Sequence, residues 1–149
     1  MDKSTIDEMD LYYQTLEERP DIGWFLQGHL VVEHLLRRRL IEKGTDETKI
    51  QKMGFFSITS KCFEGKIINK KQKEALLFIN RIRNKYAHEL TYKPSLSEWI
   101  DLWKTCQIGF SDQTDGIEQG LEELNSVEKL EDADRFHLNE LFVQICHDI

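Results

Sequence analysis

The sequence predicts an all-α protein in which residues 1–149 fold as a single domain of about five or six helices. Apolar residues recur at spacings of three and four along most of the chain, as in helices that bury one face. Two prolines and eight glycines leave little material for the turns of a β sandwich. No apolar run approaches the ~18 residues of a membrane-spanning helix, and no membrane association is expected.

The N-terminal third of the chain is expected to form two helices. Ser4 or Thr5 can cap a first helix over about 5–18, which ends before Pro20. A second helix is predicted over about 22–43. It is apolar on nearly all sides, which is typical of a central, buried helix.

Gly28, inside this second helix, is expected to allow close packing of a neighbouring helix. His29 and His34 are expected on its polar face rather than as metal ligands, because no third ligand stands at metal spacing. The three cysteines are odd in number and lack the spacing of a zinc site or a disulfide framework. Neither a metal nor a cofactor is therefore expected, and a reducing cytoplasm is the expected location.

The middle of the chain is expected to form short helices over 46–53 and 55–64, followed by a long helix over about 70–90. A stripe of this long helix has spacings of four, three and four and should be buried. The stripe consists of Ala75, Ile79, Ile82 and Tyr86.

The C-terminal third is expected to contain three more helical stretches. Ser95 and Glu98 form a capping-box pattern that opens a helix over about 96–109. Residues 110–116 are rich in turn formers, and a helix is expected again at 117–124. A last helix over about 126–147 should bury one seam, made of Val127, Leu130, Asp134, Leu138, Leu141 and Ile145.

Residues 83–88, Arg-Asn-Lys-Tyr-Ala-His, are the most informative stretch for function. They resemble the Arg-x4–6-His motif of the HEPN superfamily, in which Asn or Asp often follows the arginine and Ala-His often closes the motif. Over about residues 50–92 the layout is nearest to the mannitol operon repressor-like (MltR) group. The resemblance implies a helical bundle that is usually a homodimer, and a metal-independent endoribonuclease of the toxin–antitoxin or phage-defence kind.

The resemblance assigns Arg83 to the scissile phosphate, His88 to proton transfer and Asn84 to orientation. Histidine suits proton transfer because its pKa lies near neutral pH, and the planar fork of arginine can hold two phosphate oxygens. One chain offers one such histidine, so two copies of His88 in a homodimer would divide the acid and base roles.

Helix geometry leaves the choice of arginine open. At 100° per residue His88 falls ~140° from Arg83, but ~20° from Arg81 and ~40° from Asn84. The motif points to Arg83, whereas the rotation about the helix axis points to Arg81 as an alternate phosphate-binding residue.

Charge is unevenly distributed along the chain. Residues 61–93 carry 9 positive and 3 negative charges, whereas residues 94–149 carry 3 positive and 13 negative charges. Lys70, Lys71 and Lys73 would attract RNA nonspecifically, and Lys85 is a second alternate phosphate-binding residue. A solvated lysine face is the alternative interpretation of the same charges.

A non-catalytic HEPN/MltR-like regulatory or protein-interaction module is the alternative function, with an antitoxin or regulatory protein as partner. The acidic C-terminal third favours it, because this charge repels nucleic acid. Arg83 would then pair with an acidic residue such as Glu33. HEPN toxins that pair with a nucleotidyltransferase antitoxin carry a tyrosine two residues after the histidine. Here Tyr92 is four residues after His88, so the modified-tyrosine role is not expected.

Overall fold

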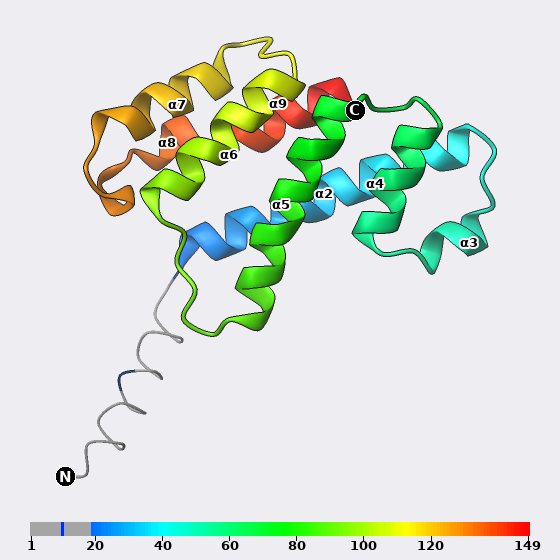
Figure 1. The fold of residues 1–149 in the computed structure, drawn as a ribbon, viewed down its shortest axis with the longest axis horizontal. Coiled ribbons are helices and arrows are strands. Elements are labelled where there is room, and N and C mark those ends of the chain that lie inside the picture. Colours follow the sequence, from blue (N-terminus) through cyan, green and yellow to red (C-terminus); the bar gives the residue numbers. More distant parts are fainter. Residues whose placement is uncertain (1–9, 11–18) are drawn as a thin grey trace.

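The computed structural model describes Asp10 and residues 19–149, and every regular element in this part of the chain is a helix (Figure 1). The six helices of nine residues or more are α2 Pro20–Glu42, α4 Phe55–Glu64, α5 Lys70–His88, α6 Leu96–Gly109, α7 Gly116–Ser126 and α9 Glu140–Asp148. The shorter ones are α3 Glu47–Gln51, α8 Arg135–Leu138 and the 3₁₀ helix η1 Leu130–Asp132. The predicted all-α class is confirmed. Apart from Asp10, the helix predicted over 5–18 lies outside the described residues.

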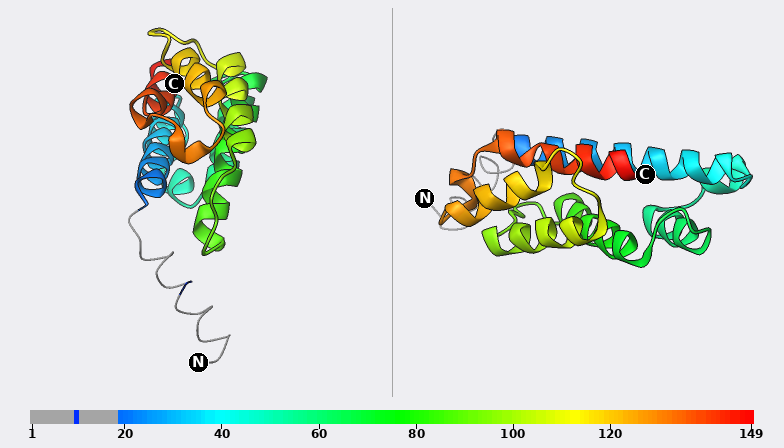
Figure 2. Two further views of the ribbon diagram at one scale, coloured as in Figure 1. Left: turned by 90° about the vertical axis from the view of Figure 1, so that its left-hand side faces the viewer. Right: turned by 90° about the horizontal axis from the view of Figure 1, so that it is seen from above.

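The helices form two layers around a hydrophobic core. Helix α2 runs along the long axis with α9 beside it, and α5 and α6 lie across from them (Figure 2). Helix α5 packs on α6, α4 and α2, so three neighbours fix its position. Among the described helices, none combines the length and the apolar character that a membrane span requires.

Helix α2 differs from its prediction in two ways. It begins at Pro20 rather than near residue 22, because proline lacks the N–H that the first helical position leaves unpaired. It is also not buried all round, since Leu30 is 62% and Val31 50% exposed. Only one side of α2 faces the second layer. The expected close packing at Gly28 is confirmed, because a Cβ there would lie 2.3 Å from the Phe142 ring of α9.

Local signals set the ends of α5 and α6. The Asn69 side chain accepts from Gln72 N at 2.8 Å and the Gln72 side chain accepts from Asn69 N at 3.0 Å, which forms a capping box before α5. Ser95 caps α6 by accepting from Glu98 N at 3.1 Å. The Glu98 side chain does not close the predicted box, because it is bound to Lys85 and Tyr92 instead.

The prediction of a single helix over 126–147 is wrong. Val127 is extended, and η1, α8 and α9 follow as separate pieces. The Asp134 side chain accepts from Phe136 N at 2.9 Å and starts α8, so a polar residue expected on the buried seam acts as a cap. Leu138, Leu141 and Ile145 are nevertheless buried, as predicted for the seam, whereas Val127 and Leu130 are only partly buried.

Candidate functional site at the end of helix α5

The motif occupies the last two turns of α5. Asn84 and His88 are exposed, Arg83 is half-buried, and Arg81, two residues before the motif, is exposed. The helix ends after His88, where Glu89 N donates to Lys85 O at 2.9 Å. Asn84 and His88, which share a face with Arg81, are therefore presented to solvent at a helix end.

Tyr86 is only partly buried, in contrast to the prediction for the stripe, but it anchors this helix end to the core. Its hydroxyl donates to Asp21 at 3.0 Å, and its ring lies 5.5 Å from the Phe25 ring. Arg19 pairs with Asp21 at 2.9 Å and donates to Tyr92 O at 3.1 Å, which fixes the loop after α5. Residues 65 positions apart in sequence thus hold the motif in place.

The protonation states of this anchor are fixed by burial and by hydrogen bonds. Burial raises the pKa of Tyr86, and the Asp21 charge raises it further, so the phenol stays protonated and serves as a donor. Burial also raises the pKa of Asp21, but hydrogen bonds from Arg19 and Tyr86 and the Arg19 charge outweigh it. The pKa of Asp21 therefore lies below its ordinary value of 3.8. Tyr86 is an anchoring residue rather than a proton-transfer group.

Lys85 belongs to the motif but is already held in an ion pair. Its Nζ is 2.9 Å from a Glu98 carboxylate oxygen and 5.5 Å from the centre of the Tyr92 ring. The Tyr92 hydroxyl also donates to Glu98, and both burial and this hydrogen bond raise the pKa of Tyr92. Glu98 offsets the Lys85 charge, so phosphate binding by Lys85 would require that ion pair to open.

Neither arginine hydrogen-bonds His88 within the described residues, so the choice between them stays open. The Arg83 guanidinium donates to Asn84 Oδ1 at 3.4 Å, a long hydrogen bond at the surface. Arg81 lies over the Phe78 ring of its own helix at 4.9 Å. The alternative partner of Arg83, Glu33, is paired with Arg37 at 2.7 Å.

His29 is a correction to the sequence-based expectation. It is 4% exposed rather than on a polar face, with its Nε2 3.2 Å from Asn80 Oδ1 and its ring 4.2 Å from the Phe55 ring. Burial lowers the pKa of His29 and outweighs the Asn80 hydrogen bond and the Glu33 charge, which raise it, so the neutral ring is favoured. The sequence did indicate this burial, because His29 lies four residues after Phe25 and three before Val32, the spacing of one buried helix face. His34 is exposed, as expected.

Lys70, Lys71 and Lys73 lie at the opposite end of α5 from His88. At 1.5 Å per residue they are ~22–27 Å from it along the helix axis. Lys70 and Lys71 are exposed, Lys71 is 3.9 Å from Glu74, and Lys73 Nζ lies 4.8 Å from the centre of the Phe63 ring. Positive charge at a helix N-terminus opposes the helix dipole, so helix stability does not account for these lysines. Within one chain these three lysines are therefore far from the motif.

Among Asp10 and residues 19–149, no three His, Cys, Asp or Glu side chains gather in a way that could hold a metal ion. The three cysteines are free, and Cys62 and Cys106 are buried. No family model, curated protein or solved structure matches the chain. The functional assignment therefore depends on the residues and geometry at the end of α5.

Proposed function

We propose that the protein is a metal-independent endoribonuclease of the HEPN type, acting as a toxin or defence effector. The supporting observation is the exposed pair Asn84 and His88 on one face of a helix end that Tyr86 anchors in the core. An anchored helix end keeps catalytic side chains in a fixed geometry, which is what positioning of a phosphodiester requires.

In this proposal His88 transfers protons, Asn84 orients the phosphate or the imidazole, and Arg83 or Arg81 stabilises the charge that develops on phosphorus. The 2′-hydroxyl attacks the phosphorus, its proton passes to a base, and the leaving 5′ oxygen takes a proton from an acid. The products are a 2′,3′-cyclic phosphate and a free 5′-hydroxyl.

The proposed active form is a homodimer, because two proton transfers call for two groups and α5 carries one histidine. All five histidines lie within the described residues, and the other four are elsewhere. His29 is buried, whereas His34, His137 and His147 are on α2, α8 and α9. The second group would be His88 of the partner protomer, across a two-fold axis beside α5.

The test compares wild type, His88→Ala and His34→Ala on structured RNA in EDTA. His34 is an exposed histidine on α2 and makes a matched control. Because both protomers of a His88→Ala homodimer lack the histidine, the acid and the base are lost together, and cleavage should slow by at least about 10²–10⁴-fold, while His34→Ala retains wild-type activity. Equal cleavage by all three proteins, or none by any of them on several RNAs, would remove the ribonuclease assignment.

Two further measurements address the arginines and the dimer. If Arg83 holds the phosphate, Arg83→Ala should lose activity and Arg81→Ala should retain it; the reverse result assigns Arg81. Sedimentation should show a dimer at the assay concentration, and a monomer at high micromolar concentration would contradict the two-chain site. Cleavage should also weaken as salt is added, because lysine–phosphate attraction is screened.

A non-catalytic protein-interaction module is the second candidate, and an exposed apolar groove between α2 and α9 favours it. The groove has a volume of about 540 Å³. Its lining includes Val31, which is 50% exposed, and Val143, which is 43% exposed. Apolar surface of this kind is often covered by a protein partner, here an antitoxin or regulatory protein. The test has two parts. Val31→Asp should lose a complex that the wild-type chain forms with a co-encoded protein. The purified wild-type chain should cleave no RNA. A wild-type complex that survives Val31→Asp would exclude the groove as the partner site.

A further inference from the structure

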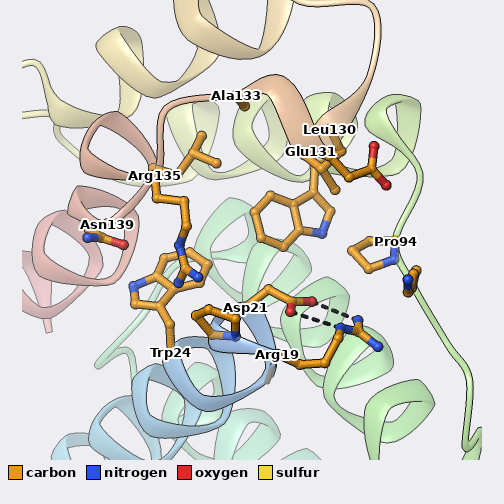
Figure 3. A pocket seen from close by; sticks show the side chains of 13 residues that line it. Arg19, Asp21, Trp24, Pro94, Leu130, Glu131, Ala133, Arg135 and Asn139 are labelled. Carbon is orange, nitrogen blue, oxygen red and sulfur yellow. Dashed lines mark hydrogen bonds and ion pairs between the residues drawn. The ribbon is translucent and has the colours of Figure 1, made fainter. Parts of the chain in front are cut away.

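A cavity separate from the motif lies between the start of α2, the loop after α5, the start of α6 and the segment from η1 to α9 (Figure 3). Its volume is about 310 Å³. Small-molecule sites span roughly 300–1,000 Å³, so this cavity matches a ligand of one or two fused rings.

Two indoles form the apolar wall of the cavity. The rings of Trp24 and Trp99 have centroids 5.7 Å apart and are tilted by 46°. Pro20, Pro94 and Leu130 add apolar surface around them. Such a wall favours a flat, apolar ligand, because aromatic rings gain contact energy by stacking at their faces or edges.

Two donors at the cavity, the Arg135 guanidinium and the Trp99 indole N–H, have no partner among the described residues. Arg135 is half-buried, and no ion pair joins its guanidinium to a carboxylate of the described residues. Figure 3 shows its side chain extending toward Trp24. Trp99 is 3% exposed, and its indole N–H is buried without an acceptor in the described part of the chain.

The acidic groups at the cavity do not meet these donors. Both Asp21 oxygens accept hydrogen bonds from Arg19, at 2.9 and 3.1 Å, and one also accepts from Tyr86. Glu131 lines the cavity but is an exposed residue. The cavity thus combines two tilted indole rings with a cation that no carboxylate of the described residues pairs.

The geometry points to a binding site for a small planar aromatic anion, with its ring system against Trp24 and Trp99 and its carboxylate or phosphate at Arg135. A free aromatic acid and a nucleotide both have this chemistry. The site uses none of the motif residues, so it stands whether or not the chain cleaves RNA.

The test measures binding to the full chain by isothermal titration calorimetry with two probes, 2-naphthoate and adenosine 5′-monophosphate. At least one of them should bind at a single site with a Kd below about 1 mM. Binding of 2-naphthoate alone identifies a free aromatic acid as the ligand type, and binding of the nucleotide alone identifies a nucleotide. Uncharged 2-naphthamide should bind about tenfold or more weakly than 2-naphthoate, because it lacks the charge that Arg135 would meet.

Variants separate this site from nonspecific binding. Arg135→Gln should weaken binding about tenfold or more, whereas Arg38→Gln, an exposed arginine of α2, should bind as wild type. Ala133 is 8% exposed and lines the cavity, so Ala133→Leu should fill part of it and reduce binding without removing a charge. Circular dichroism confirms that each variant is folded. Failure of both probes to bind, or equal binding by Arg135→Gln and wild type, would overturn the assignment.

Discussion

Replacement of Gly28 by alanine tests the close contact between α2 and α9. A Cβ at this position would lie 2.3, 2.4 and 2.6 Å from three atoms of the Phe142 ring. Carbon atoms in contact are ordinarily about 3.5–4.0 Å apart, so the ring would have to move by more than ~1 Å. Phe142 is 5% exposed and its ring centroid lies 5.1 and 5.3 Å from those of Trp24 and Phe25, so moving the ring would disturb both contacts.

The expected effect is a balance of two terms. Alanine is more favourable than glycine inside a helix by about 1 kcal/mol. Overpacking of a filled core costs about 1–3 kcal/mol. Gly28→Ala should therefore leave stability unchanged or lower it by up to ~2 kcal/mol. By itself this range is too wide to show whether α9 packs closely on α2 at Gly28.

Gly23→Ala in the same helix removes the ambiguity. A Cβ at Gly23 meets nothing within 4 Å, so Gly23→Ala gains the higher helix propensity of alanine without a steric clash. The difference between the two variants isolates the packing cost, and Gly28→Ala should be the less stable by about 1–3 kcal/mol. For a chain of this size that corresponds to about 2–4 °C in Tm per kcal/mol.

Urea unfolding followed by far-UV circular dichroism gives the two free energies of unfolding directly. Equal stability of the two variants, or greater stability of Gly28→Ala, would show that the Phe142 ring does not press on the α2 backbone. This result would contradict the close packing of α9 on α2 at Gly28.

Two other predictions concern local features of the same fold. The pKa of Asp21 lies below 3.8 in the folded chain, so its ionised form stabilises the fold at higher pH, and this stability is lost as the pH falls below 3.8 through the folded pKa. Urea unfolding at a series of pH values should thus show Asp21→Asn less stable than wild type at neutral pH, with the gap closing in acid; a gap independent of pH would contradict the ion pair. Asn69→Ala should lower the free energy of unfolding by about 1 kcal/mol because it removes the cap of α5. Asn69→Asp keeps the cap and adds favourable negative charge at the helix N-terminus, so it should be at least as stable as wild type in the same assay; a loss in Asn69→Asp as large as in Asn69→Ala would refute the capping role.

The sequence determined the helices whose ends carry local signals. Helices α5 and α6 begin where predicted, and the buried positions Ala75, Ile79 and Ile82 follow directly from their spacing. These features depend on residues within one or two turns of each other, so short-range spacing and capping chemistry suffice to predict them. The placement of Asn84 and His88 on one exposed face follows from the same rotation about the helix axis. The HEPN resemblance, the RNA substrate and the dimer stay predictions.

Only the tertiary structure decided which groups surround the motif. Asp21 and Glu98 lie 65 and 13 residues from their partners Tyr86 and Lys85, and no local pattern links either pair. The same applies to the burial of His29 beside Asn80 and to the cavity lined by Trp24, Trp99 and Arg135. Helical spacing gives the direction in which a side chain points, but the partner it meets depends on how the helices cross. That crossing is set by packing between layers, such as the contact of Phe142 with Gly28.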